Sequence, residues 1–325
     1  MTQNKKGNSF KDYYEGKIVL VTGGSGYIGS ALIDKLRKLN CKIIRTSRNK
    51  LATMDGVQDK IFDLKNKECW IEIVSCADIV FHLAGNTSVS FAEKNVDKSL
   101  QTTLLPIANL IYASKKLDIC PKVIYASTAT VYGMIEIQPV SEEVAPSPVS
   151  IYDLHKLYAE QYLTMAHNQG LLSVKSLRLA NVYGPSLNES HSKDRGILSK
   201  ITKACIQGHI ISAYGGGNYL RDYIYIDDVV DAFLCSGIAD SPHIILNVAS
   251  GIGTTVKAVF EMIASEVKKN LGTSSKIIDT NWPNNINIIE TRNFIASNKK
   301  LKSMLGWKVN VPLKTGIQRL VQHYS

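Results

Sequence analysis

The sequence predicts an α/β fold: a doubly wound parallel sheet joined to a smaller C-terminal α/β lobe. Three observations predict it. The chain has 325 residues, enough for one large sheet domain and a smaller lobe. From residue 17 to residue 179, short apolar runs alternate with segments of helical periodicity, as in strand–helix–strand crossovers. After residue 183 the alternation loosens, and breaker clusters at 214–218 and 281–285 interrupt it.

The individual elements follow from the positions of the apolar residues. We expect strands where a short apolar run ends in glycine or polar residues, because a strand covered on both faces is apolar throughout. We expect helices where apolar residues recur every three or four positions. The expected strands are 17–22, 42–46, 77–84, 122–127 and 173–179, and the expected helices are 28–39, 99–117 and 151–168.

Composition and charge exclude several classes of protein. Lysine and arginine number 38 against 28 acids, a formal charge of +10, but the cations are spread along the chain without a basic arm or stripe. We therefore expect a small anionic ligand and no nucleic acid. No stretch approaches the roughly 20 apolar residues of a membrane span, and the first residues are polar, so we expect a cytoplasmic protein without a membrane partner. The six cysteines lack zinc spacing, which predicts reduced thiols and no metal.

A glycine-rich turn follows the first expected strand and opens the first expected helix. Gly23, Gly24, Gly26 and Gly29 satisfy both Gly-x-x-Gly-x-x-Gly and Gly-x-Gly-x-x-Gly. Glycines there let a pyrophosphate approach the backbone, and the helix N-terminus offers it free N–H donors. We assign residues 1–182 to a dinucleotide-binding Rossmann domain to which later segments return, and 183–325 mainly to a substrate lobe. The expected cofactor contacts from this turn are Gly23, Gly26, Tyr27, Ile28 and Gly29.

The end of the second strand bears on which dinucleotide binds. An acid there would accept hydrogen bonds from the ribose of NAD. The chain has Ser47 and Arg48 instead, a hydroxyl and a guanidinium suited to a 2′-phosphate. We favour NADP(H) and leave NAD(H) open. Further candidate cofactor contacts follow later strands, and they are Asp63, Leu64, Leu83 and Ala84.

A tyrosine and a lysine share one face of the helix expected at 151–168. Tyr152 and Lys156 lie four positions apart, so the ammonium lies beside the phenol and favours its ionised form. This makes Tyr152 a candidate acid and base for an alcohol–ketone couple. Ser127 and Thr128, at the end of the preceding strand, are the accompanying hydroxyl candidates.

Seven segments carry a recognisable set of motifs: GGSGYIGS (23–30), FHLAG (81–85), STATVYG (127–133), YDLHK (152–156), LRLANVYGP (177–185), RDYIYIDDVV (221–230) and LGW (305–307). With them the chain resembles the extended short-chain dehydrogenase/reductase family, specifically its nucleotide-sugar epimerases, reductases and dehydratases. The resemblance implies that Thr128 holds a sugar oxygen, with Ser127 as its neighbouring candidate, and that Lys156 also grips the nicotinamide ribose. It places Asn181, Arg221 and Arg292 at the diphosphate of a nucleotide sugar.

The departures from the family pattern narrow the chemistry. The 4,6-dehydratases carry Asp-Glu directly after the catalytic threonine, whereas this chain has Ala129 and Thr130. Neither can protonate a leaving hydroxyl or remove a C5 proton, so a dehydratase is not expected. The same holds for decarboxylases that rely on a glutamate at the second position. Hydride transfer at one sugar carbon remains.

Two enzyme functions stay open at this point. We favour an NADP(H)-dependent 4-ketoreductase of a nucleotide-linked deoxysugar, because a net reductant often uses NADPH. A 4-epimerase that keeps its cofactor is the alternative, which the STATVYG segment favours. A non-catalytic nucleotide- or RNA-binding scaffold is the distant alternative, since such a chain is expected to lose Tyr152 or Lys156. The resemblance also implies a homodimer through the helices near 99–117 and 151–168, with Leu104, Ile107, Ile111, Leu157 and Tyr162 as contact candidates.

Overall fold

The computed structural model of the chain describes residues 10–186, 196–240, 245–284 and 286–325. Its main feature is a seven-stranded sheet in the order β10-β6-β5-β4-β1-β2-β3. All neighbouring pairs are parallel, which confirms the predicted fold class. The strands are β1 (Ile18–Thr22), β2 (Lys42–Ser47), β3 (Val57–Ile61), β4 (Ile79–His82), β5 (Lys122–Thr128), β6 (Ser173–Leu179) and β10 (Ile245–Val248).

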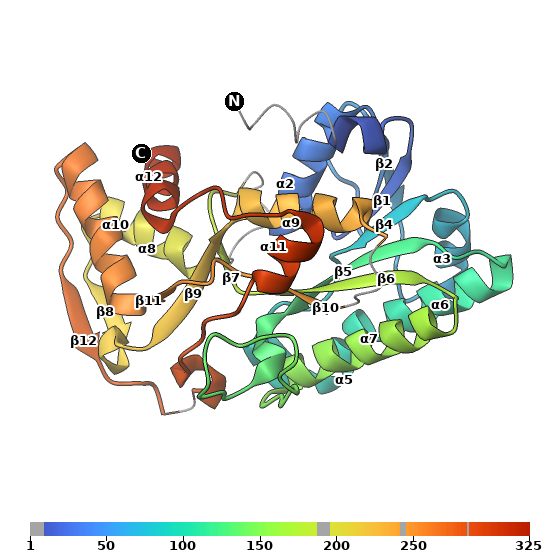
Figure 1. The fold of residues 1–325 in the computed structure, drawn as a ribbon. Helices are drawn as coiled ribbons and strands as arrows, with labels where there is room; N and C mark the ends of the chain where they lie inside the picture. Colours follow the sequence, from blue (N-terminus) through green and yellow to red (C-terminus); the bar gives the residue numbers. More distant parts are fainter. Residues whose placement is uncertain (1–9, 187–195, 241–244, 285) are drawn as a thin grey trace.

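Helices cover both faces of this sheet (Figure 1). One face packs into an apolar core with α3, α6 and α7, and the other packs with α2 and α9. The strand β10 and the helix α9 come from the second half of the chain, so that half also contributes to the seven-stranded sheet and to the helices that cover it. The helices of these layers are α2 (Tyr27–Leu36), α3 (Lys67–Val74), α4 (Val89–Lys94), α5 (Val96–Thr103), α6 (Leu105–Leu117), α7 (Ile151–Asn168), α9 (Ile226–Ile238) and α11 (Lys299–Leu305).

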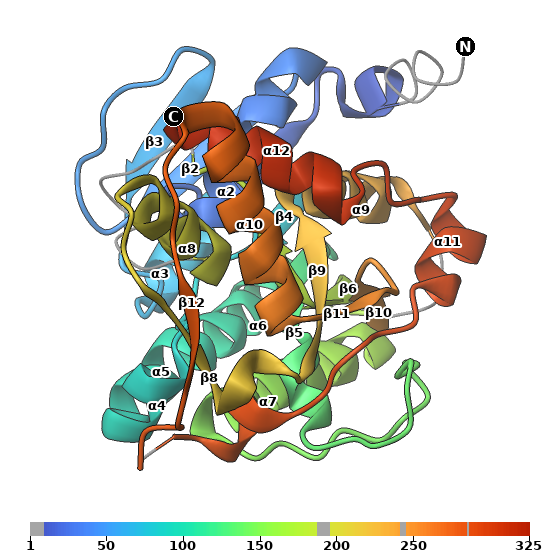
Figure 2. The same ribbon diagram turned by 90° about the vertical axis from the view of Figure 1, so that its left-hand side faces the viewer.

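The smaller lobe lies beside the carboxyl ends of the sheet strands (Figures 1 and 2). It contains a three-stranded sheet in the order β11-β9-β7 and a two-stranded sheet of β12 and β8. Its apolar core forms between these strands and three helices. The elements are β7 (Asn181–Tyr183), β8 (Ile211–Tyr214), β9 (Leu220–Tyr225), β11 (Gly253–Thr255), β12 (Ile277–Thr280), α8 (Ile197–Ile206), α10 (Val256–Leu271) and α12 (Leu313–Tyr324).

The helix predicted at 99–117 is two helices. Helix α5 ends at Thr103 and α6 begins at Leu105. Pro106 stands in the first turn of α6, where its missing N–H costs no helical hydrogen bond, whereas in the middle of one long helix it would remove one. The helix predicted at 28–39 is also shorter, since it tightens into a 3-10 turn, η1 (Arg37–Leu39).

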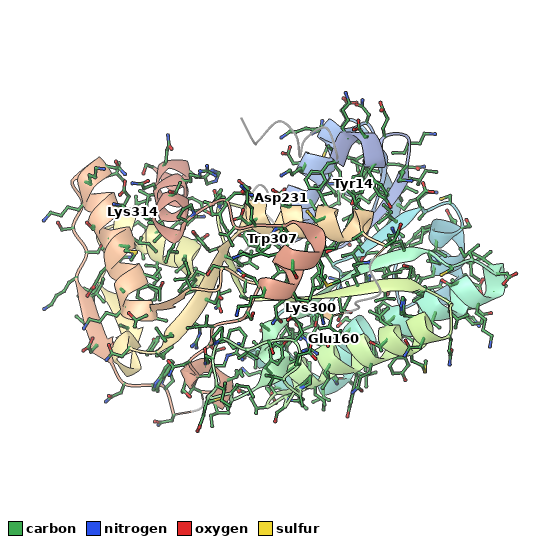
Figure 3. All side chains as sticks on the ribbon, viewed as in Figure 1. Tyr14, Glu160, Asp231, Lys300, Trp307 and Lys314 are labelled. Carbon is green, nitrogen blue, oxygen red and sulfur yellow. The ribbon has the colours of Figure 1, made fainter. Side chains whose placement is uncertain are left out.

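Buried aromatic side chains tie distant segments to α9. The Tyr14 hydroxyl donates to the Leu234 carbonyl at 2.9 Å, and the Trp307 indole N–H donates to the Asp228 carbonyl at 2.9 Å. Figure 3 shows Trp307 beside α9 and α11. The first bond fixes the segment before β1, and the second fixes the C-terminal segment, against the same helix of the large sheet layers.

Within the described ranges the structure shows no membrane-spanning helix, no cluster of metal ligands and no disulfide. No helix there is long and apolar enough to cross a membrane. No group of three His, Cys, Asp or Glu side chains within those ranges is arranged to hold a metal ion. All six cysteines are free thiols.

Candidate functional site

The glycine turn packs tightly against the end of β4. Gly23 has φ +68°, and a Cβ there would lie 2.7 Å from the Ala84 backbone nitrogen. The Ala84 N–H donates to the Thr22 hydroxyl at 3.2 Å, and the Leu83 N–H to the Thr22 carbonyl at 3.2 Å. The structure therefore brings Gly23, Leu83 and Ala84 together at the carboxyl edge of the sheet, where parallel α/β sheets bind ligands.

The N-terminus of α2 fits an anionic group. Its N-cap is Gly26, which supplies no capping side chain, and the first turn carries no acid. The first N–H groups and the positive end of the helix dipole are left for a ligand. A Cβ on Gly29 would overlap the Gly23 carbonyl, so only glycine permits this close turn. These features fit the pyrophosphate of a dinucleotide.

The other residues expected to contact the cofactor, which are Tyr27, Ile28, Asp63 and Leu64, make contacts within the chain itself. The Tyr27 hydroxyl donates to the Gly184 carbonyl at 2.9 Å, so its side chain joins α2 to the smaller lobe, and Ile28 packs between two cores. The Asp63 carboxylate accepts the Lys65 N–H at 3.0 Å in a turn. The Leu64 carbonyl accepts the Trp70 indole N–H at 2.8 Å, which fixes this turn near the strand ends.

The adenosine end of the expected site carries no carboxylate on β2. Ser47 is the last residue of that strand, and its hydroxyl donates to the Asn49 carbonyl. Arg48 is exposed, and no hydrogen bond or ion pair joins its guanidinium to the rest of the described chain. The guanidinium is therefore available to a ligand.

Thr128 is the last residue of β5 and is nearly buried. Its hydroxyl oxygen accepts the Thr130 N–H at 3.2 Å and lies 2.8 Å from the Thr130 hydroxyl. Ser127 is placed differently, because consecutive strand residues point to opposite faces. Its hydroxyl donates to the Glu160 carboxylate. Of the two hydroxyl candidates, Thr128 therefore lies at the strand end, and Ser127 belongs to a buried network.

Tyr152 and Lys156 lie in the first two turns of α7. Ser150 caps that helix by accepting the Asp153 N–H at 3.1 Å. This bond fixes the start of α7 and therefore the position of Tyr152 in its first turn. The Lys156 ammonium donates to the Ala126 carbonyl at 2.9 Å and lies 4.8 Å above the Tyr125 ring. Burial is the main cause that raises the pKa of Tyr125, and the nearby Tyr152 raises it further. Tyr152 and Lys156 thus share one neighbour on β5.

The Lys156 ammonium is held in a desolvated position. The side chain is 4% exposed, and burial lowers its pKa to about 8, against the opposing charge of Glu160. Glu160 lies one turn further along α7 and forms a buried ion pair with Arg178 at 2.7 Å. The Glu160 carboxylate is therefore paired with Arg178, and no ion pair joins Lys156 to an acid of the described chain.

Two buried arginines, Arg221 and Arg292, lie close together. Arg221 follows the start of β9, and its guanidinium donates to the carbonyls of Leu220, Glu290 and Arg292. Arg292 is 5% exposed, and its Nε and Nη1 have no hydrogen-bond partner among the described residues. Burial, and then the charge of Arg221, lowers the pKa of Arg292 to about 10. Two cations packed together with unused donors suit a diphosphate.

Asn181 lies on the same face as Arg221. It pairs in parallel register with Tyr223 on β9, two residues after Arg221, so the two side chains leave neighbouring strands on one side. The structure therefore brings two of the three predicted diphosphate residues together on one sheet, with Arg292 joined to them through its backbone carbonyl.

One buried acid near the site has no role in the sequence predictions. Asp153 is fully buried; burial raises its pKa, and hydrogen bonds from Thr130 and Ser150 and the charge of Arg292 oppose that. Its Oδ1 lacks a partner within the described ranges. An aspartate in the first turn of a helix is common for dipole reasons alone, so its sequence position does not single it out.

Two histidines near these side chains are buried. His155 is buried, and its Nδ1 lies 3.0 Å from the Ser99 hydroxyl of α5. The tight packing of α5 against α7 buries that side of the helix, which no single-helix pattern reveals. The His82 Nδ1 lies 2.7 Å from the Thr22 hydroxyl, and burial lowers the pKa of His82 to about 3.

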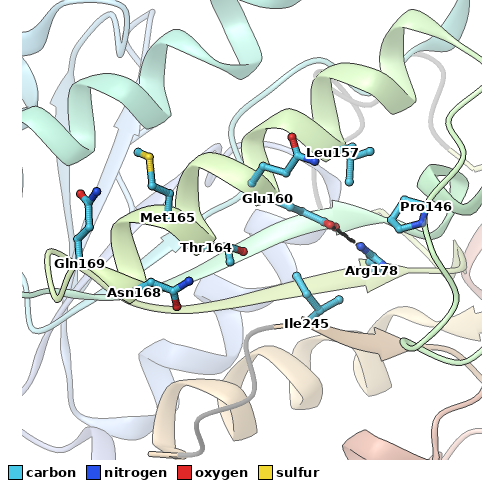
Figure 4. A pocket seen from close by; sticks show the side chains of 10 residues that line it. Pro146, Leu157, Glu160, Thr164, Met165, Asn168, Gln169, Arg178 and Ile245 are labelled. Atoms are coloured by element: carbon cyan, nitrogen blue, oxygen red, sulfur yellow. Dashed lines mark hydrogen bonds and ion pairs between the residues drawn. The ribbon is translucent and has the colours of Figure 1, made fainter.

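A cavity of about 530 Å³ lies along α7 outside this site. Its lining comes from the outer side of α7, from β6 and from Ile245 of β10, and the Glu160–Arg178 ion pair borders it (Figure 4). It contains none of Thr128, Tyr152 and Lys156. The candidate site is therefore defined by the strand ends and not by this cavity.

The chain is similar to known proteins in sequence and in fold. A dTDP-4-dehydro-6-deoxyglucose reductase of Escherichia coli is 28% identical, with 94% of this chain and 96% of that protein covered. The crystal structure of Thermotoga maritima UDP-glucose 4-epimerase with UDP-glucose matches at a TM-score of 0.84 and 28% identity, covering 94% of this chain and 98% of that one. The Thermus thermophilus UDP-glucose 4-epimerase complex with NAD matches at 0.81 and 26%, covering 94% and 98%. The family model described as "NAD dependent epimerase/dehydratase family" matches residues 19–249, and the chain belongs to this family of nucleotide-sugar enzymes.

Proposed function

We propose that the chain is a nucleotide-sugar 4-epimerase, which oxidises C4 of a nucleoside-diphosphate hexose and reduces it again from the other face. The observation that carries the proposal is the placement of Thr128, Tyr152 and Lys156 at the strand ends, with Ala129 and Thr130 where an acidic pair would support elimination. The two UDP-glucose 4-epimerase structures support it. This reverses the order of preference from the sequence, where the 4-ketoreductase comes first.

Each side chain has a defined task in this reaction. The nicotinamide, when bound, supplies the hydride acceptor and donor. Tyr152 takes the proton of the sugar 4-hydroxyl and later returns it, while the Thr128 hydroxyl holds the same oxygen in line. Lys156 provides the positive charge that favours the phenolate form of Tyr152. Arg221 and Arg292, with Asn181, hold the diphosphate and so fix the distance of the hexose from Tyr152.

A 4-ketoreductase is the second candidate function, and the adenosine end favours it. Ser47 and Arg48 occupy the end of β2, where no carboxylate stands. A guanidinium without a protein partner suits the 2′-phosphate of NADPH, the usual net reductant. The reductase of Escherichia coli shows that this reaction occurs among similar chains.

The consumption of cofactor separates the two candidates. An epimerase is expected to interconvert UDP-glucose and its C4 epimer with cofactor present far below the substrate concentration. A reductase is expected to oxidise one NADPH for each 4-keto sugar consumed. Chromatography of the sugars beside the absorbance of the reduced nicotinamide measures both quantities, and turnover of UDP-glucose that requires stoichiometric NADPH contradicts the epimerase.

Replacing Arg48 by alanine is expected to weaken NADPH binding roughly 10- to 150-fold, because a charged hydrogen bond contributes on the order of 1.5–3 kcal/mol. NADH binding is expected to change little, since it lacks the 2′-phosphate. Calorimetric dissociation constants for both cofactors measure this. Lys50→Ala, at an exposed cation two residues away, is the matched control and should have a small effect. A wild type that binds NADH more tightly than NADPH contradicts the prediction.

We also propose that the chain forms a homodimer through α5 and α7, which pack against each other. Apolar side chains stay exposed on both helices, namely Leu100, Tyr158, Tyr162 and Met165. Ile107, expected at this contact, is instead fully buried in the core of the same subunit. Sedimentation at micromolar concentration should give a dimer, and Tyr162→Glu should give a folded monomer. A monomeric wild type contradicts the proposal.

A further inference from the structure

We propose that Arg45 and Asp59 set the preference between NADPH and NADH, with Arg45 neutralising a carboxylate that otherwise stands beside the adenosine ribose. The inference rests on the dinucleotide binding of the proposed function, but on neither of its two candidate reactions. Arg45 lies on the same strand as the position where a cofactor-selecting acid is expected, Asp59 lies on the neighbouring strand, and the sequence motifs include neither.

The two side chains form a nearly buried ion pair across adjacent strands. Arg45 on β2 and Asp59 on β3 are register partners in the parallel sheet. The Arg45 guanidinium donates to Asp59 through Nε at 2.6 Å and through Nη2 at 2.8 Å, a two-pronged arrangement. The Arg45 side chain is 3% exposed and that of Asp59 is 21% exposed, so the carboxylate is partly open to what lies outside the sheet.

The pair lies next to the two places that define the adenosine site. Arg45 precedes Ser47 by two residues, so both side chains leave β2 on the same face. The aliphatic stem of Arg45 also packs under the glycine turn, since a Cβ on Gly24 would lie 2.8 Å from the Arg45 Cγ. Arg45 is therefore enclosed between the pyrophosphate turn and the end of β2.

A third hydrogen bond extends the pair to the loop that carries Arg48. The Arg45 Nη2 donates to the Ala52 carbonyl at 3.0 Å. Residues 48–56 join β2 to β3, and this bond fixes the middle of that loop to the buried guanidinium. The position of the exposed Arg48 thus depends on the same side chain that neutralises Asp59.

The electrostatic consequence has opposite signs for the two cofactors. With Arg45 present, Asp59 contributes little net field at the ribose. Without Arg45, the Asp59 carboxylate repels the 2′-phosphate of NADPH, while toward NADH it resembles the acid that accepts bonds from the 2′-hydroxyl. With Asp59 neutralised, the unpaired Arg45 cation attracts the 2′-phosphate. The balance between these two residues, and not the strand end alone, then decides the preference.

Four proteins test this by calorimetric binding of NADPH and of NADH: the wild type, Arg45→Met, Asp59→Asn and the double variant. We expect Arg45→Met to weaken NADPH binding roughly tenfold relative to NADH, and Asp59→Asn to strengthen it by a similar factor. The double variant, which carries neither charge, should return the ratio of the two dissociation constants to within about threefold of the wild type. Arg45→Lys, which keeps the charge, should keep the ratio.

A purely structural role gives a different pattern. If the ion pair only supports the fold, both single variants lower the thermal midpoint and weaken both cofactors alike, so the ratio does not move in opposite directions; this result overturns the inference. The hypothesis that the wild type prefers NADPH is tested separately. A wild type that binds NADH more tightly contradicts that hypothesis. Opposite shifts of the ratio in the two single variants still support the inference in that case.

Discussion

Replacing Tyr152 by phenylalanine is expected to lower turnover about 10²- to 10⁴-fold and to leave the dissociation constant of the dinucleotide within about twofold. In the proposed reaction the phenol group accepts and returns the proton of the sugar oxygen, and phenylalanine preserves the ring and its packing. In the proposed reaction the Thr128 hydroxyl only holds the oxygen, and its own hydroxyl partner in the structure is Thr130 at 2.8 Å. The measurement is steady-state turnover beside calorimetric cofactor binding.

Tyr158→Phe is the matched control, because Tyr158 is an exposed tyrosine on the same helix. It should turn over at the wild-type rate. Full activity of the Tyr152 variant removes this residue from the mechanism. A parallel loss of cofactor binding instead assigns Tyr152 to the cofactor pocket.

Replacing Lys156 by methionine is expected to damage rate and cofactor affinity together. The ammonium lies beside Tyr125 and donates to the Ala126 carbonyl, and the proposed roles assign it to both the phenol and the nicotinamide ribose. Loss of a charged hydrogen bond predicts roughly 10- to 150-fold weaker dinucleotide binding, with a further loss in turnover. Methionine matches the length of the stem and needs no desolvated charge, so the fold should persist. A variant changed only in thermal midpoint shows that Lys156 is structural.

The pH dependence of the wild-type kcat/KM tests the role of Lys156 independently of the variant. Burial lowers the pKa of Lys156 to about 8, so the charged form that supports Tyr152 is lost as pH rises through that value. The wild-type kcat/KM should therefore fall above about pH 8. The folded state binds fewer protons than the unfolded chain between this pKa and the ordinary lysine value, so this group makes stability rise with pH in that window. Deprotonation of Lys156 over this range therefore does not itself destabilise the fold.

The sequence predicts well those features that depend on near neighbours in the chain. The glycine turn at 23–29 lies where its motif places it, because only glycine permits the contact of Gly23 with Ala84. Tyr152 and Lys156 lie on one face of α7 because helical geometry fixes positions i and i+4. The break between α5 and α6 was open to the same reasoning, since Pro106 marks a first helical turn.

Features that depend on strand register or on distant backbone are not predictable in this way. The Arg45–Asp59 pair requires knowing that β2 and β3 are adjacent and in a particular register. Strand alternation predicts that Ser127 points away from Thr128, but its hydrogen bond to Glu160, which is paired with Arg178 of β6, depends on distant parts of the chain. Arg221 is oriented by three carbonyls, two of them about 70 residues later in the chain, so its place beside Arg292 depends on the packing of the C-terminal segment.

Conversion of UDP-glucose deuterated at C4 is the measurement that tests the central claim most directly, namely hydride transfer at C4 within one site. The label should appear at C4 of the epimer, with none released to solvent, and the rate should fall below that of unlabelled substrate because the C4–H bond breaks in the reaction. Release of deuterium to water during epimerisation would mean proton abstraction at that carbon, and it would contradict both the hydride mechanism and the roles assigned to Tyr152, Lys156 and Thr128.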